Sequence, residues 1–353
     1  MINSLDDRAL LRWSGAIVVA IAAGALCGWL DTPIPWMLGP LVALALLRML
    51  GADLHAPPLS QQAGQWVIGT ALGLYFTPAV VRAVASAWYV PVAGALSAIL
   101  IGYAAAAVLA RVARIDRTTA LFASVPGGAA EMAVLGERFG ARVDRVAASQ
   151  SLRLLMVVAI VPTAFALSGV HGSDSYVVGP KSFDLAGFAI LMAATLAGGV
   201  IASRVNVPNP LVLGALAVCI PLTVAEINLS SMPTPVSNAA QLLLGCAIGS
   251  RFQRDFLRDA PRFVAGVIVS VLFSIAVAAA LGYLLALASG QNTATMILSL
   301  APGGIAEMAI TAKVLQLGVP LVTACHVLRL IVLLLVTVPV FERARTLRRR
   351  DKP

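Results

Sequence analysis

Charged residues are scarce in this sequence, and their scarcity excludes a water-soluble globule. Only 12% of the 353 residues are Asp, Glu, Lys or Arg, whereas 59% are hydrophobic. Soluble domains carry roughly 25% charged residues, so this chain has too little polar surface to cover a globule in water. Its apolar runs are long and do not alternate in polarity, which predicts helices in lipid. The expected fold class is an all-α polytopic membrane protein.

Metal-binding and nucleophilic side chains are also sparse. The only histidines are His55, His171 and His326, which are scattered along the chain, and the four cysteines form no CxxC pair. The cysteines lie in apolar segments and are expected to be small core residues. We therefore expect no metal site and no cofactor. Because no nucleophile–base pair is evident either, we expect no catalytic residues and no enzymatic activity.

The net charge of +9 lies in short loops and in the basic C-terminal run 343–353. This distribution follows the positive-inside bias of cytoplasmic segments. No soluble reading domain or recognisable recognition motif accompanies the basic run. We therefore expect a cytoplasmic tail and no direct nucleic-acid partner.

The sequence contains an internal duplication. Residues 126–133, PGGAAEMA, return as PGGIAEMA at 302–309, and the Leu-Arg-Leu of 152–154 returns at 328–330, both at an offset of 176 residues. A period this long indicates a duplicated domain rather than a solenoid. The expected organisation is a first membrane repeat at 1–170, a linker at 171–182, a second repeat at 183–342 and a basic tail at 343–353.

Basic loops change sides between the two repeats. The loop after the apolar segment 86–110 carries three arginines, but its counterpart at 288–291 has no charge; the reverse holds around Arg82 and its counterpart at 251–262. This switch predicts inverted repeats, each with an odd number of crossings. Each half has six apolar segments, so one must not cross.

The segments that contain Pro-Gly-Gly, 118–137 and 292–313, are the candidates for not crossing. We expect five crossings per repeat plus one broken or re-entrant segment, with both termini cytoplasmic in a bacterial inner membrane. The alternative is that these two segments cross the membrane as pairs of half-helices.

The Pro-Gly-Gly sequences predict breaks within the apolar segments. Pro126 has no amide hydrogen and disfavours a helix at the preceding residue. Gly127 and Gly128 can adopt backbone conformations that are closed to other residues. Glu131 follows in the first turn after the break, and Glu307 occupies the same place after the second. A lone proline–glycine pair is usually a packing kink. Its duplication with a glutamate favours a functional site, since intramembrane ionisable groups are functional by default.

Arg153 and Arg329 lie inside the next apolar segments. Burying an unpaired guanidinium costs at least ~2.5 kcal/mol, so each arginine needs a partner. Glu131 and Glu307 are the expected partners, in the same repeat or across the pseudo-twofold axis. The pairs are either structural ties or a substrate clamp with a proton-exchanging carboxylate.

Two other pairs of residues share repeat positions. Gln150 and His326 stand three residues before the two arginines. His326 is either a proton relay or a hydrogen-bonded interior histidine. Gln65 and Gln241 begin stripes of small residues, which favour close helix packing.

These motifs, with the entry Ile-Pro-Trp-Met-Leu-Gly-Pro at 34–40, resemble the AbrB-type duplicated integral membrane family. Its members carry labels such as regulator of aidB expression and ammonia monooxygenase. The resemblance covers about residues 13–341 and implies an association with regulation of gene expression. The monooxygenase label is not supported, because a copper site needs clustered histidines.

The Pro-Gly-Gly break is also similar to the crossover helix of the cation–proton antiporter and bile-acid symporter superfamily. That similarity is looser. Glu131 and Glu307 stand where sodium symporters of that type often have small polar residues, which puts sodium coupling in doubt.

The function predicted from these features is secondary transport of a small anionic or zwitterionic solute, coupled to protons, at the paired breaks. The alternative is a membrane-embedded regulator or sensor without transport. The expected partners are the solute, protons and the lipid bilayer, and analogy alone suggests a homodimer. The expected substrate- or ion-binding residues are Pro126, Gly127, Gly128, Glu131, Arg153, Pro302, Gly303, Gly304, Glu307 and Arg329.

Overall fold

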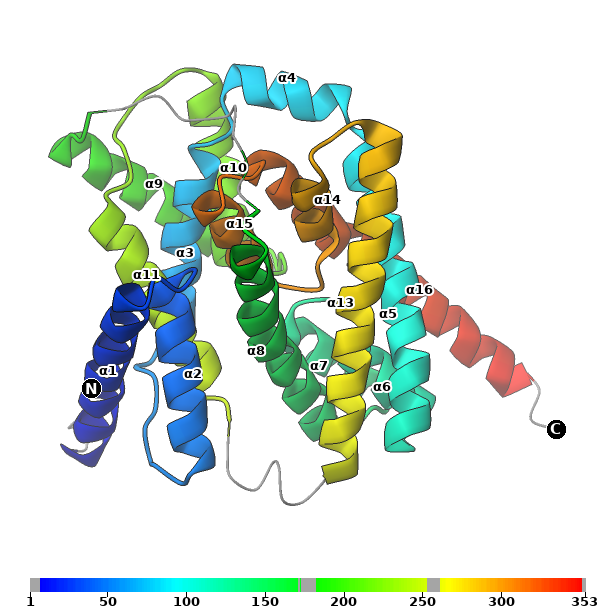
Figure 1. Ribbon diagram of the computed structural model, residues 1–353. Helices are drawn as coiled ribbons and strands as arrows, with labels where there is room; N and C mark the ends of the chain where they lie inside the picture. Colours follow the sequence, from blue (N-terminus) through cyan, green and yellow to red (C-terminus); the bar gives the residue numbers. More distant parts are fainter. Residues whose placement is uncertain (1–6, 171, 173–181, 253–260, 351–353) are drawn as a thin grey trace. The chain divides into compact units, whose positions relative to one another are not determined.

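The structure, a computed structural model, describes residues 7–170, 172, 182–252 and 261–350, and within them it contains helices and no strand (Figure 1). The expected all-α fold class is confirmed for this part of the chain. The predicted linker at 171–182 falls almost entirely outside the described residues. The predicted tail at 343–353 begins as a continuation of the last helix, which extends to Arg350.

Five helices are long and apolar enough to cross a membrane. They are α1 (Asp7–Trp29), α5 (Tyr89–Ala113), α8 (Val143–Leu167), α9 (Leu185–Arg204) and α13 (Pro261–Ser289). Shorter apolar helices are α2 (Pro35–Met49), α10 (Pro210–Val224) and the first part of α16 (Val319–Arg350). A span normally needs about 20 residues, so these lengths indicate a membrane protein but leave the predicted ten crossings a prediction.

One expected segment is interrupted. The sequence of residues 62–81 is one apolar run, but in the structure α3 (Ser60–Gly73) and α4 (Pro78–Ser86) meet there at a bend of 89° (Figure 1). Pro78 occupies the first turn of α4. It lacks the amide hydrogen that a continuing helix would need, whereas at a helix start that loss costs nothing.

The chain forms two compact units, and each draws on both sequence repeats. The first unit consists of residues 1–86, 154–261 and 306–320, and the second of residues 87–153, 262–305 and 321–353. The first contains α1 to α4 and α9 to α11 (Thr234–Gly249). Each unit therefore combines segments of both repeats.

Repeat-related glycines bring the helices of the first unit together. A methyl group added to Gly69 of α3 would lie 2.9 Å from the carbonyl oxygen of Val212 in α10. At the matching position of α11, a methyl group on Gly245 would collide with the carbonyl of Met37 in α2. Each repeat thus supplies a glycine for the other repeat's short helix, as expected for small-residue packing between membrane helices.

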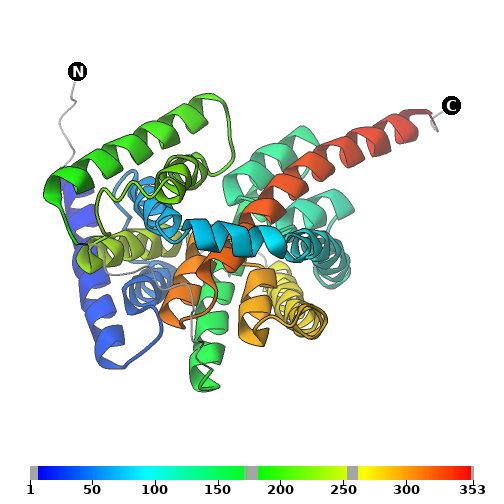
Figure 2. The same cartoon turned by 90° about the horizontal axis from the view of Figure 1, so that it is seen from above.

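The second unit contains α5 and α13 side by side, as Figures 1 and 2 both show. Ser270 donates to the carbonyl of Ala105 at 2.9 Å, and Gly266 lies against Ala113. The same unit contains α6 (Arg117–Ser124), α7 (Ala129–Arg138) and α14 (Thr293–Leu300). These short helices form the edges of both Pro-Gly-Gly breaks.

Candidate functional site

Both predicted breaks are present. α6 ends at Ser124 and α7 begins at Ala129, while α14 ends at Leu300 and α15 (Ile305–Val314) follows. The residue before each proline is extended, as a following proline demands: Val125 has φ −62° and ψ 128°, and Ala301 has φ −54° and ψ 139°. The duplicated sequence therefore forms a duplicated backbone conformation.

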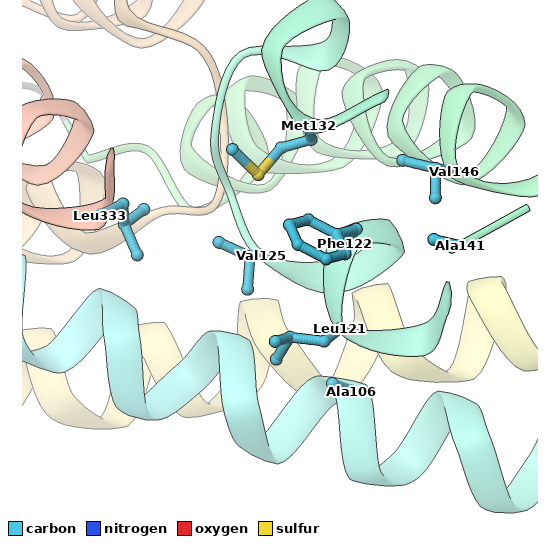
Figure 3. Close-up of a cluster of buried hydrophobic side chains, with 8 residues drawn as sticks. All are labelled: Ala106, Leu121, Phe122, Val125, Met132, Ala141, Val146 and Leu333. Atoms are coloured by element: carbon cyan, nitrogen blue, oxygen red, sulfur yellow. The ribbon is translucent and has the colours of Figure 1, made fainter. Parts of the chain in front are cut away.

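The first break is the tip of a helical hairpin. The rings of Phe122 in α6 and Phe139 after α7 stack with their centroids 5.9 Å apart. The amide of Arg142 donates to the hydroxyl of Thr119, in the first turn of α6, at 3.0 Å. The chain therefore leaves and returns at the same end. Figure 3 shows Phe122 in the middle of the apolar cluster that fills this hairpin, with Met132 beside it.

The buried arginines bind the backbone of the breaks. Arg153, which is 4% exposed, donates from Nη1 to the carbonyl of Val125 at 2.9 Å and from Nη2 to that of Gly127 at 3.4 Å. Arg329 makes the same pair of bonds to Ala301 and Gly303, at 2.9 and 2.5 Å. A helix end leaves carbonyls without intrahelical partners, and a guanidinium fork can supply two donors at once.

This carbonyl partnership was missed from the sequence, although the freed carbonyls were a signal for it. The predicted pairing of Arg153 and Arg329 with Glu131 and Glu307 stays a prediction.

Gln150 reinforces the first break. Its side chain is fully buried, and Nε2 donates to the carbonyls of Phe122 at 2.8 Å and Val125 at 3.0 Å. At the matching position of the second repeat, His326 is also fully buried, with Nδ1 2.9 Å from the carbonyl of Val322 in its own helix. The interpretation of His326 as a hydrogen-bonded interior histidine fits this placement.

Glu131 lies at the start of α7, where its carboxylate folds over Gly128. A methyl group added to Gly128 would collide with that carboxylate. A methyl group on Gly127 would lie 2.7 Å from the side chain of Met132. A side chain at either position would therefore displace the end of a neighbouring side chain, the thioether of Met132 or the carboxylate of Glu131. In its present place the Glu131 carboxylate is stabilised by the dipole of α7, because it lies at the helix N-terminus.

Glu307 has a cationic neighbour that the sequence analysis did not single out. Glu307 is 8% exposed in the first turn of α15, and its charge attracts Arg251, which follows the end of α11. Arg251 Nη2 donates to Gln61 Oε1, in the first turn of α3, at 2.5 Å. The three residues belong to the first unit. The repeat could not reveal this neighbour, because the position that matches Arg251 is Tyr75.

The two breaks lie against one helix of the second unit. A methyl group on Gly102 of α5 would lie 3.4 Å from Pro126, and one on Gly94 would lie 3.7 Å from Leu300, two residues before Pro302. These glycines are separated by eight residues, or about 12 Å along a helix. α5 therefore contacts the first break directly and the end of α14, which leads into the second break.

Metal ligands do not cluster in the part of the chain that the structure describes. There, no group of three or more His, Cys, Asp or Glu side chains is placed to hold a metal ion.

Residues 36–345 match the profile of the family described as transition state regulatory protein AbrB. The chain is 24% identical over 366 residues to a protein of Bacillus subtilis (strain 168) named "Uncharacterized protein YhjN", covering 96% of this chain and 94% of that protein. It is 25% identical over 331 residues to "Putative regulator AbrB" of Escherichia coli (strain K12), covering 92% of this chain and 94% of that protein.

Proposed function

The chain belongs to the AbrB family, and from this premise we propose that it is a proton-coupled secondary transporter of a small anionic or zwitterionic solute. The observation that carries the proposal is the pair of buried guanidinium groups fixed at the two duplicated helix breaks. Positive charge is costly in an apolar bundle, so its repeated placement at broken helices is typical of an ion or substrate path.

The solute site proposed here combines two sources of positive potential. The guanidinium groups of Arg153 and Arg329 lie beside the breaks, and α7 and α15 begin immediately after them. Helix N-termini favour anions, and a guanidinium binds a carboxylate through two parallel hydrogen bonds. These features support a solute with at least one anionic group.

Glu131 is the residue proposed to couple binding of the solute to binding of a proton. Its carboxylate covers Gly128 at the N-terminus of α7, the same place that would attract an anionic solute. Protonation would remove the charge of Glu131 and weaken its hold on the helix end. A solute carboxylate could then take that place, so that proton and anion bind together. Glu307 is proposed for the equivalent role in the second repeat.

The proposed membrane arrangement is two inverted repeats of five crossings, each with one re-entrant segment, in a bacterial inner membrane with both termini cytoplasmic. The hairpin formed by α6 and α7 supports re-entry, because the start of α6 and the residues after α7 contact each other. The joint contribution of both repeats to each compact unit supports a pseudo-twofold relation. Because the proposed transport moves the solute without changing it chemically, we propose a non-enzymatic role.

The proposal is tested by screening the purified full-length protein against a metabolite library by thermal shift, at pH values of roughly 6 and 8, which bracket neutrality. Hits are then assayed for uptake into proteoliposomes under an imposed pH gradient. The wild type is expected to take up the solute, and Glu131→Gln and Glu307→Gln are expected to insert but not to transport. Full uptake by both variants would refute the assigned site.

A second candidate function is a membrane-embedded regulator or sensor, because one relative carries the name regulator. Binding of a solute without flux in the same proteoliposomes would favour this alternative. Flux driven by the proton gradient would favour transport.

A further inference from the structure

Two buried oxygen atoms beside the first break lack hydrogen-bond partners among the described residues. They are Oε1 of Gln150 and Oγ of Ser124. Gln150 is fully buried and Ser124 is 8% exposed, so bulk water does not serve either atom in this conformation. A buried acceptor without a donor costs about 1–3 kcal/mol, and such atoms are rare unless they have a role.

The orientation of the Gln150 amide is determined by its other end. Nε2 donates to the carbonyls of Phe122 and Val125, so Oε1 points away from them on the opposite side of the amide group. Oε1 is an acceptor only. The amide cannot be flipped without placing an oxygen against two carbonyl oxygens, so an acceptor is permanently presented next to the break.

The carbonyl of Val125 also accepts a hydrogen bond from a positively charged side chain. Val125 O accepts from Gln150 Nε2 at 3.0 Å and from Arg153 Nη1 at 2.9 Å. The Gln150 amide group and the Arg153 guanidinium therefore meet at one carbonyl of the break. A guanidinium attracts a carboxylate, whereas the amide oxygen needs an N–H or O–H donor.

We propose, on the basis of the transport function above, that Gln150 and Ser124 form a hydrogen-bond-accepting subsite beside Arg153 for a carboxylic acid with an amino or hydroxyl group next to its carboxylate. Arg153 binds the carboxylate, and Gln150 Oε1 receives the neighbouring donor, with Ser124 Oγ as a second acceptor. Gln150 is then a specificity-determining residue, and a simple carboxylate that lacks the donor is disfavoured because it leaves both oxygens unsatisfied.

The test compares three probes with the same carbon skeleton: propanoate, 2-hydroxypropanoate and alanine. Affinity for the full-length detergent-purified protein is measured by titration with a thermal-shift readout. The wild type is expected to bind at least one donor-carrying probe roughly tenfold more tightly than propanoate, the effect of about one hydrogen bond. Gln150→Leu is expected to abolish that preference, and Ser124→Ala to reduce it.

Matched controls separate the subsite from general damage. Gln241→Leu and Ser237→Ala alter a buried glutamine and a buried serine of the first unit, and they should keep the wild-type preference. Ser124→Ala removes no hydrogen bond to the breaks, so it remains informative if Gln150→Leu fails to fold.

If folded Gln150→Leu keeps the wild-type preference for a donor-carrying probe over propanoate, the subsite is overturned. If Gln150→Leu does not fold, the same preference in Ser124→Ala overturns it. In either case the two oxygens would be assigned to bound water. Equal binding of all three probes by the wild type, or binding of none, would also overturn it. Preference without flux in proteoliposomes would retain the subsite but refute transport.

Discussion

At the residue scale, each buried arginine acts as the hydrogen-bond partner of a broken helix. Arg153 and Arg329 each connect the carbonyl before the proline to the carbonyl of the first glycine. The arginine therefore offsets the loss of backbone bonding that the break causes. A break without such a donor would expose unsatisfied carbonyls within the apolar bundle, where each costs several kcal/mol.

The geometry of this contact predicts that lysine cannot replace arginine. Arg153→Lys and Arg329→Lys keep the charge but lose the planar fork that reaches two carbonyls. Each variant should lose about 0.5–1.5 kcal/mol of stability, the net value of one hydrogen bond. Thermal unfolding in detergent measures this loss, with the exposed Arg204→Lys as the control. Wild-type stability in both Arg153→Lys and Arg329→Lys would contradict a stabilising bond from each guanidinium to two carbonyls.

Gly128 provides a second prediction at this scale. Gly128→Ala should force the Glu131 carboxylate away from the start of α7, because the added methyl group occupies its place. Proton-coupled uptake should then fall severalfold or more while the protein still inserts. Gly28→Ala is the control, since its added methyl would approach Pro35 only to 3.9 Å. Normal uptake by Gly128→Ala would argue against a role for this placement of Glu131.

At the element scale, the short helices α2 and α10 depend on glycines supplied by the opposite repeat. Gly69 packs against Val212 of α10, and Gly245 packs against Met37 of α2. The two contacts involve corresponding residues in both directions. Close approach of this kind is what stabilises membrane helices in the absence of a hydrophobic driving force between them.

These contacts predict similar penalties at the two positions. Gly69→Val and Gly245→Val should each destabilise the protein by about 1–3 kcal/mol, the usual cost of overpacking. Thermal unfolding should show comparable losses, because the surroundings of the two glycines are related by the repeat. A large loss at one position and none at the other would show that the reciprocal packing does not hold.

At the scale of the whole molecule, each compact unit is assembled from both repeats rather than from one. The first unit takes α1 to α4 from one repeat and α9 to α11 from the other, and the second unit takes both breaks. Neither sequence half therefore folds into its own compact unit. We expect that the separately expressed halves would each lack the partner helices that their glycines contact.

The proposed topology makes a prediction about labelling. Asp116 precedes α6 and Arg142 follows α7, and the hairpin between them brings both to one end. In a variant without the native cysteines, Asp116→Cys and Arg142→Cys should react with a membrane-impermeant thiol reagent from the same, cytoplasmic side. Cysteines placed in the uncharged loop 288–291 should react from the opposite side. Labelling of Asp116→Cys and Arg142→Cys from opposite sides would establish a crossing by half-helices.

The sequence alone determined the class of protein and the position of the breaks. Low charge and long apolar runs without alternation predict helices in lipid, and proline followed by two glycines predicts a break in each of the two segments that contain it. The duplication also showed that the residues around Glu131 and Glu307 form a matched pair. These conclusions depend on local chemistry, which a sequence contains in full.

Only the tertiary structure decided which groups the buried side chains contact. It bonded Arg153 to carbonyls about 26 to 28 residues earlier, placed Arg251 within the field of Glu307, and bent the chain between α3 and α4. Partners distant in sequence are chosen by packing and by the need to satisfy every buried polar group, and residue spacing does not encode either. The inward orientation of Gln150, and hence its unsatisfied oxygen, is likewise a property of the folded chain alone.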